Sequence, residues 1–212
     1  MLQHHLTVPR TARYHTLGDA ATAKALWVVL HGYGQLARYF LRKFEGMEGG
    51  LFIAAPEGLS RFYMDDGHSR VGATWMTRED REHEIADQIS YLDRLANTLL
   101  ATCPPGTPMN VLGFSQGVAT ACRWLGLGHA RAQQLVLWGG NLPPDLPAGA
   151  WTARLGATRT LLVHGERDPI VPGSVLAANE VVLRGAGVPH ESLRHDGGHE
   201  LDTLLLRRLL TR

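Results

Sequence analysis

Residues 109–128 read MNVLGFSQGVATACRWLGLG, the most informative segment of the chain. An apolar run, MNVL, leads into the pentapeptide GFSQG (113–117), and a helical pattern follows directly. A serine between two glycines, set between a strand and a helix, is typical of a nucleophile elbow, a sharp turn that lifts the serine oxygen above the sheet edge. Side chains at Gly113 and Gly117 would crowd the strand and helix packed against the turn. The pattern therefore predicts Ser115 as a nucleophile.

Similar apolar runs recur along the chain, and helical patterns fall between them. Runs of this length without alternation fit strands that are covered on both faces, as in a parallel sheet. Strands that alternate with helices predict an α/β fold with a mostly parallel sheet. The expected strands are ALWVVLHG (25–32), LFIAAPEG (51–58), MNVLGFS (109–115), QLVLWGG (134–140), RTLLVHGERD (159–168) and HESLRHDGGH (190–199). The expected helices are EIADQISYLDRLANTLL (84–100), with Thr77 and Asp80 offering an N-terminal cap, QGVATACRWLGLG (116–128) and ELDTLLLRRLL (200–210).

The length and composition favour a single domain over residues 1–212. The opening segment is expected to form a short hairpin from His5–Val8 and Arg13–Leu17. A formal net charge of +1, with 44% hydrophobic and 19% charged residues, gives no bias toward nucleic acid. Because the longest apolar run is far too short to span a bilayer, we expect no stable membrane insertion and a cytoplasmic location. Cys103 and Cys122 are interpreted as reduced structural thiols.

A serine hydroxyl is a weak nucleophile at neutral pH, so Ser115 requires a base. In this kind of fold the partners follow in the order Ser, Asp or Glu, then His, each at the carboxyl end of a strand. HGERDPIVP (164–172) supplies Asp168 as the acid, and HDGGHE (195–200) supplies His199 as the base. Glu166 and Asp196 are alternatives for the acid, and His195 is an alternative for the base, although it ends its strand. Seven other histidines are interpreted as surface or turn residues: His4, His5, His15, His68, His83, His129 and His190.

Backbone N–H groups are expected to stabilise the oxyanion. Gln116 opens the helix after the nucleophile, so its N–H points at the same place as the Ser115 oxygen. The second donor is expected from the loop LHGYGQ (30–35), where the Tyr33 N–H is our choice. His31 is expected to have a structural hydrogen-bonding role.

With these residues in place, the chain resembles the carboxylesterase/phospholipase family of α/β-hydrolases, which includes acyl-protein thioesterases, lysophospholipases and small bacterial esterases. The resemblance rests on LHGYGQ (30–35), APEG (55–58), GATWM (72–76), GFSQG (113–117), HGERDPIVP (164–172) and GGHE (197–200). It implies an α/β-hydrolase fold, no cofactor and no metal, and it assigns the same catalytic and oxyanion residues. Trp75 matches a family tryptophan and is either a wall of the substrate pocket or a plain buried aromatic. Tyr33 and Gln35 depart from the family's HGLGD loop, so the acyl pocket, which Gln35 is expected to line, is expected to be either differently shaped or more polar.

The interval from Asn141 to Thr158 is too short for a cap domain, so the site is expected to be open. This favours a carboxylesterase acting on short- to medium-chain esters, with a small-molecule ester as partner. A lysophospholipase, an acyl-protein thioesterase and a catalytically silent ligand receptor remain alternatives. A dienelactone-hydrolase-like enzyme would carry Cys at position 115. The sequence leaves open whether the protein is a monomer or a homodimer.

Overall fold

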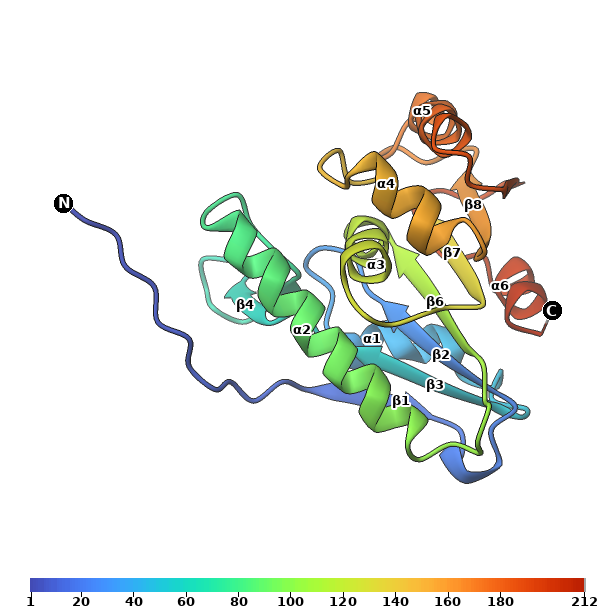
Figure 1. Cartoon of the computed structure of the whole chain (residues 1–212), viewed down its shortest axis with the longest axis horizontal. Helices are drawn as coiled ribbons and strands as arrows, with labels where there is room; N and C mark the ends of the chain where they lie inside the picture. Colours follow the sequence, from blue (N-terminus) through green and yellow to red (C-terminus); the bar gives the residue numbers. More distant parts are fainter. Residues whose placement is uncertain (212) are drawn as a thin grey trace.

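The computed structural model describes residues 1–211. These residues form one seven-stranded sheet with helices on both faces, together with a separate two-stranded hairpin (Figure 1). The elements in chain order are β1 (Tyr14–Leu17), η1 (Ala20–Thr22), β2 (Ala25–Leu30), α1 (Ala37–Leu41), η2 (Arg42–Phe44), β3 (Leu51–Pro56), β4 (Ser60–Tyr63), β5 (Val71–Thr74), α2 (Arg81–Leu100), β6 (Met109–Phe114), α3 (Gln116–Leu127), β7 (Gln134–Trp138), α4 (Ala148–Ala150), η3 (Trp151–Leu155), β8 (Arg159–Gly165), α5 (Gly173–Gly185), β9 (His190–His195) and α6 (Thr203–Leu210).

The large sheet has the strand order β1-β3-β2-β6-β7-β8-β9. All of its neighbouring strands pair in parallel except β1, which pairs antiparallel with β3. The sheet is therefore mostly parallel, and the six strands expected from apolar runs are all present. Parallel strands direct their carboxyl ends to one edge, so the loops after β2, β6, β8 and β9 meet there.

Both faces of the sheet are buried, which explains why its strands read as unbroken apolar runs. In β2, the side chains of Leu26, Val28 and Leu30 pack on the side covered by α2, α3 and α5. Trp27 and Val29 point to the opposite side, which is covered by α1 and α6. These five side chains are almost fully excluded from solvent, so β2 is anchored from both sides just before the loop it leads into.

The N-terminal hairpin expected from the sequence is wrong. Residues 5–8 form no strand, and β1 pairs with β3 at the edge of the large sheet, with Tyr14 opposite Pro56 and Leu17 opposite Ile53. The edge of β3 presents unpaired backbone N–H and C=O groups along its length, so β1 can pair with it directly. A local hairpin would have to form both of its strands at once. The Glu57 N–H also donates to the Arg13 carbonyl, which continues this pairing beyond the strand.

Two further features differ from expectation. Helix α2 begins at Arg81, and Asp80 at its N-cap position makes no capping bond with its side chain. The carboxylate of Glu84 instead accepts hydrogen bonds from the Thr77 N–H and from the Thr77 hydroxyl. The Thr77 hydroxyl, which was expected to help cap the helix, is therefore already bonded to Glu84. The hairpin of β4 and β5 was not expected, because its strands are only four residues long and carry no apolar run.

The β4–β5 hairpin supports the loop after β2. The Gly34 N–H donates to the Ala73 carbonyl at 2.9 Å. A Cβ at Gly72 would lie 2.7 Å from the Gly34 carbonyl oxygen, so only glycine permits this approach. The hairpin thus fixes the loop that leads from the sheet into the candidate site.

The interval expected to lack a cap domain contains a loop followed by α4 and η3. The Leu142 and Leu146 side chains of this loop are buried in the main core. In the described part of the chain, no helix combines the length and the apolar character that crossing a membrane requires.

Candidate active site

Ser115 sits on a strained turn between β6 and α3. Its backbone has φ 54° and ψ −117°, a combination that residues with side chains rarely adopt. A Cβ at Gly113 would lie 2.3 Å from the Gly117 carbonyl oxygen, and a Cβ at Gly117 would lie 2.3 Å from the Leu30 carbonyl oxygen. Both distances are far below van der Waals contact, so the two glycines are required by packing, as the sequence predicted.

Three of the predicted side chains are linked by two consecutive hydrogen bonds. The Nε2 atom of His199 lies 2.9 Å from the Ser115 hydroxyl oxygen, and its Nδ1 atom lies 2.7 Å from the Asp168 Oδ2 atom. His199 comes from the loop between β9 and α6, and Asp168 comes from the loop between β8 and α5. The alternative acids, Glu166 and Asp196, are exposed and make no bond to His199. The geometry therefore joins Ser115 to Asp168 through one imidazole.

The surroundings of Asp168 keep its carboxylate ionised and fixed. The Oδ1 atom accepts hydrogen bonds from the Ile170 and Val171 N–H groups, both at 2.8 Å. Burial raises the pKa of this carboxyl, but the bonds from Val171, His199 and Ile170 outweigh that effect and hold the pKa of Asp168 below its ordinary value. With Oδ1 occupied by the backbone, Oδ2 is directed at His199, whose Nδ1 then carries the proton and whose Nε2 faces Ser115 as an acceptor.

Two backbone N–H groups next to Ser115 are free. Within residues 1–211, neither the Tyr33 N–H nor the Gln116 N–H donates to a protein acceptor. Gln116 is the first residue of α3, where backbone donors lack partners in the helix. Tyr33 belongs to the loop after β2, whose Gly32 packs against the Ser115 side chain, since a Cβ at Gly32 would lie 3.1 Å from the Ser115 Cβ.

The loop that carries Tyr33 is held by its own side chains. The Gln35 Oε1 atom accepts from the Gly32 N–H at 2.8 Å. The His31 Nδ1 atom donates to the Gly32 carbonyl at 2.7 Å, and its Nε2 atom accepts from the Gly58 N–H at 3.0 Å. Burial lowers the pKa of His31 and so keeps the ring neutral. His31 thus has structural hydrogen bonds, as expected, and Gln35 fixes the loop as well as bordering the cavity beside the site.

Trp75 does not line that cavity. Its side chain is 1% exposed and belongs to the main core. The indole N–H donates to the His31 carbonyl at 2.8 Å, and the ring stacks on His31 with centroids 4.9 Å apart. These contacts hold Trp75 behind the loop, so of the two roles considered, the buried aromatic fits and the pocket wall does not. The Gln116 side chain also braces this region, donating to the Thr74 hydroxyl at 2.8 Å.

A cavity of about 760 Å³ opens beside His199. Tyr33, Gln35 and Phe114 border it, and the Phe114 ring centroid lies 4.9 Å from that of His199. Phe114 was missed although it lies inside GFSQG, where the residue before the nucleophile deserved notice. The remaining walls come from residues 36–43, 64–71 and 200–201. These segments carry no motif, so only the folded chain reveals that they share a cavity.

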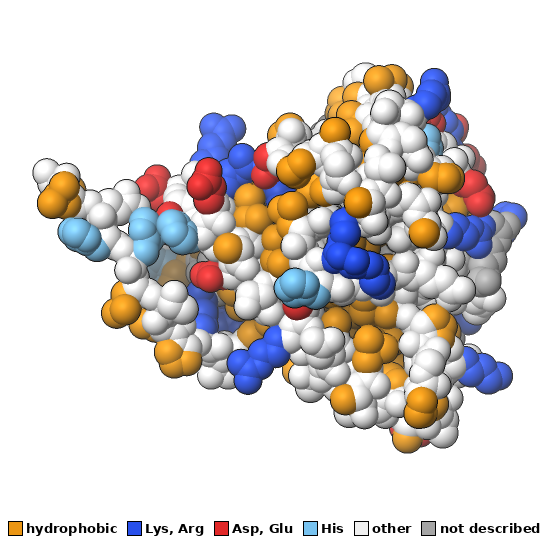
Figure 2. Space-filling view, in the orientation of Figure 1, with side chains coloured by type: hydrophobic (Ala, Val, Ile, Leu, Met, Phe, Trp, Pro, Cys, Tyr) orange, Lys and Arg blue, Asp and Glu red, His pale blue; other side chains and the backbone are white. Residues whose placement is uncertain are grey.

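One exposed group of side chains in the described part of the chain has the spacing of metal ligands. The His5 Nε2 atom lies 3.1 Å from the Asp80 Oδ1 atom, and the His83 Nδ1 atom lies 2.8 Å from it. Figure 2 shows histidine side chains gathered where the N-terminal segment meets the rest of the surface. Hydrogen bonds and stacking of the two imidazoles account for this arrangement without an ion.

Comparison with known proteins places the chain in a family. The family pattern described as serine hydrolase (FSH1) matches residues 21–203. The chain belongs to this family. It is a serine hydrolase, as expected, and the strained Ser115 on its elbow lies within the matched range. No curated protein sequence matches the chain.

Solved structures confirm the α/β-hydrolase fold. The maize acyl-protein thioesterase 2 is 21% identical with a TM-score of 0.71, and the alignment covers 95% of this chain and 98% of that one. A phospholipase/carboxylesterase from Dyadobacter fermentans is 18% identical with a TM-score of 0.68, covering 97% and 99%. The Bacillus cereus carboxylesterase is 14% identical with a TM-score of 0.70, covering 93% and 91%. This serine hydrolase therefore shares its fold with esterases and thioesterases, as the resemblance implied.

Proposed function

We propose that this serine hydrolase is a carboxylesterase that cleaves short- to medium-chain carboxylic esters through an acyl-enzyme. The observation that carries the proposal is the hydrogen-bonded run from Ser115 through His199 to Asp168, with distances of 2.9 Å and 2.7 Å. A nucleophile, a base and an orienting acid in this relation are the parts that acyl transfer needs.

In the proposed reaction, the Ser115 oxygen attacks the ester carbonyl while the His199 Nε2 atom takes the hydroxyl proton. The imidazolium then gives this proton to the leaving alcohol, and an acyl-enzyme remains on Ser115. Water attacks the acyl group with His199 again acting as base, which releases the acid and restores the serine. Asp168 holds the ring in the tautomer that leaves Nε2 free to accept and stabilises the cation that forms.

The oxyanion of each tetrahedral intermediate would be bound by the Tyr33 and Gln116 N–H groups. Their lack of other acceptors supports this role, because donors that are already bonded would have to break a bond first. A donor of this kind contributes about 3 kcal/mol to transition-state stabilisation. The N-terminus of α3 adds a favourable dipole at the same place.

Substrate size is inferred from the open approach. Only a loop, α4 and η3 lie between β7 and β8, where a cap domain would be inserted. We therefore expect activity on 4-nitrophenyl esters to peak at short or medium acyl chains. A peak at very long chains would contradict this part of the proposal.

The same open approach also suits an acyl group carried on a larger molecule, so an acyl-protein thioesterase or lysophospholipase activity is the second candidate. A panel of matched oxygen esters, thioesters and lysophospholipids separates these functions by their relative kcat/KM.

Covalent labelling tests the nucleophile itself. A fluorophosphonate probe should label the wild-type protein once and leave Ser115→Ala unlabelled. Ser174→Ala, which changes an exposed serine at the start of α5, should be labelled like the wild type. Labelling of folded Ser115→Ala, or no labelling of the wild type, would refute the proposal, and the second result would favour a silent ligand receptor.

A further inference from the structure

The cavity beside His199 combines an apolar floor with a cationic rim. Leu36, Phe40, Phe114 and Leu201 border it, and all four side chains are buried in the fold. Because Phe114 packs against His199, a chain lying on this floor would begin at the candidate catalytic centre.

Three exposed cations border the same cavity: Arg38, Lys43 and Arg70. They come from α1, η2 and the segment just before β5, so they meet only in the folded chain. Glu200 is the acidic residue of the lining, which leaves an excess of positive charge around the opening. In a chain whose formal net charge is only +1, this excess is local and is not a property of the whole surface.

The three cations have no carboxylate partner within residues 1–211. Every ion pair in this part of the chain involves other basic residues. Asp65, the acid close to Arg70 in sequence, accepts from the Arg70 backbone N–H and from the Ser69 hydroxyl. The bonds from the Ser69 hydroxyl and the Arg70 N–H, with a smaller contribution from the Arg70 charge, lower the pKa of Asp65, but the Arg70 guanidinium forms no ion pair with this carboxylate.

One of these cations is also held in place by an aromatic side chain. The Arg38 guanidinium lies 4.4 Å from the centre of the Tyr39 ring and donates to the Tyr39 hydroxyl at 2.6 Å. Arg42 approaches the same ring at 5.1 Å. Contacts of this kind restrict a long side chain without cancelling its charge, so Arg38 retains its capacity to bind an anion.

We propose that this cavity selects esters whose acyl chain ends in an anionic group, such as the half-esters of dicarboxylic acids. The inference rests on the proposed esterase function. The methylene chain would lie on the apolar floor, and the distal carboxylate would meet the three cations at the rim. Attack by Ser115 and then by water would release the dicarboxylate and the alcohol, with no other reactant.

The test compares two esters of equal length. Mono-4-nitrophenyl suberate carries a free carboxylate, and 4-nitrophenyl methyl suberate is its neutral counterpart. The sebacate pair repeats the comparison with a longer spacer. Both spacers are too long for the carboxylate to reach its own ester readily, and the uncatalysed rate of each ester is subtracted. For the wild type we expect a higher kcat/KM on the acid than on the neutral ester in at least one pair.

Removing the charges should remove the preference. The variants are Arg38→Gln, Lys43→Gln, Arg70→Gln and the triple combination. Each single change should lower the acid-to-neutral ratio of kcat/KM about twofold to fivefold, as expected for exposed ion pairs, and the triple variant about tenfold or more. Salt at 1 M, where the screening length is about 3 Å, should lower the wild-type ratio in the same direction.

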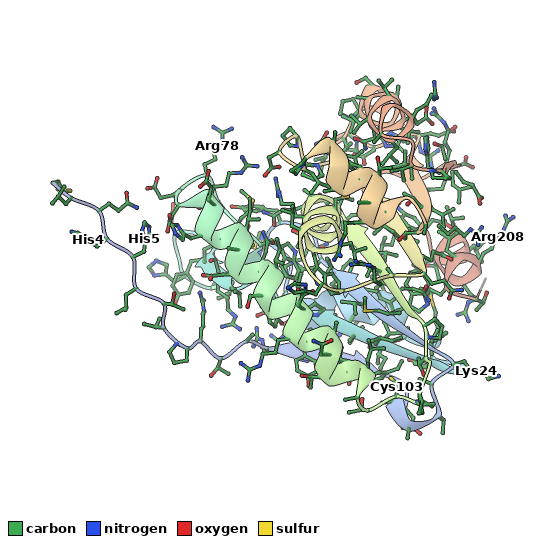
Figure 3. All side chains as sticks on the ribbon, in the orientation of Figure 1. His4, His5, Lys24, Arg78, Cys103 and Arg208 are labelled. Carbon is green, nitrogen blue, oxygen red and sulfur yellow. The ribbon has the colours of Figure 1, made fainter. Side chains whose placement is uncertain are left out.

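Lys24→Gln is the matched control, because Lys24 is an exposed cation before β2, at the end of the sheet opposite the site (Figure 3). It should leave the ratio unchanged. If both esters are hydrolysed but the triple variant keeps the wild-type ratio, the charge inference is wrong and the esterase function stands. If neither ester is hydrolysed although 4-nitrophenyl butyrate is, the charge inference is wrong; if 4-nitrophenyl butyrate is not hydrolysed either, the proposed function itself fails.

A lipid headgroup could supply the same anionic chemistry. Sedimentation with phosphatidylglycerol vesicles, compared with phosphatidylcholine vesicles, distinguishes this source. Binding to the anionic vesicles that is lost in the triple variant, without any preference for the soluble acid ester, would overturn the proposal in favour of a membrane surface. Absence of vesicle binding together with the ester preference would support it.

Discussion

Replacing Gly117 with alanine tests how closely the elbow is packed against the oxyanion loop. The new Cβ would lie 2.3 Å from the Leu30 carbonyl oxygen and 2.9 Å from that of His31. Ordinary contact begins at 3.4 Å, so α3 and the end of β2 must separate by roughly one ångström. Leu30 and His31 lead into the loop that carries Tyr33, while Gly117 directly follows Gln116, the residue after Ser115. The separation would therefore fall between the two proposed oxyanion donors.

Two measurable losses follow from this displacement. A misplacement of about 1 Å in a catalytic centre costs about 10²-fold in rate, so kcat/KM on 4-nitrophenyl butyrate should fall by that order. Overpacking costs about 1–3 kcal/mol of stability, and each kcal/mol lowers the melting temperature by about 2–4 °C in a domain of this size. Circular dichroism melts and initial rates, recorded below both melting temperatures, check the two effects.

Gly185→Ala is the control. Gly185 ends α5, and an added Cβ there meets no atom within 4 Å. This variant should keep the wild-type rate and melting temperature. A Gly117→Ala protein with wild-type turnover and stability would refute the tight packing on which the oxyanion assignment depends.

Three further predictions concern single side chains. Asp168→Asn should lower kcat by about 10⁴-fold on a neutral ester, whereas the controls Glu166→Gln and Asp196→Asn should not. A large loss of kcat in either control would show that its carboxylate, and not that of Asp168, is the acid. Glu57 is inaccessible to solvent and, although burial opposes this, bonds from two arginines lower its pKa. Its stabilising contribution is thus present above the unfolded carboxyl pKa and lost as pH falls through the folded value. Urea unfolding at pH 7 and at about pH 4 measures the free energy of unfolding at each pH. Between these two values the wild type should lose more of this free energy than Glu57→Gln, and equal losses would contradict the prediction. Burial raises the pKa of Cys122, so iodoacetamide should modify this thiol only after unfolding; rapid modification of the native protein would refute its burial.

The sequence determined those features that depend on local pattern. Strands buried on both faces read as apolar runs, so six strands of the sheet could be predicted from the chain alone. The elbow is also local, because Gly113, Ser115 and Gly117 are forced by the geometry of one turn. The order of serine, acid and histidine then narrowed the candidate site to a few side chains.

Only the tertiary structure decided which of these groups meet. Ser115 and His199 are 84 positions apart in the chain, and strand register together with loop packing brings their side chains within 2.9 Å. Register likewise placed β1 against β3, where local pattern predicted a hairpin. Trp75 is a large aromatic residue of the kind that often lines a substrate pocket, but a hydrogen bond to the His31 carbonyl holds it in the core.

The cavity shows most clearly the difference between what local sequence pattern predicts and what long-range packing determines. Arg38, Lys43 and Arg70 have no common motif, and nothing in their spacing indicates a shared site. Their side chains border one cavity because α1, η2 and the β4–β5 hairpin pack around the carboxyl edge of the sheet. Sequence pattern thus identified GFSQG as an elbow, since a turn is specified by a few neighbouring residues. Long-range packing, which no local pattern encodes, determined what surrounds Ser115.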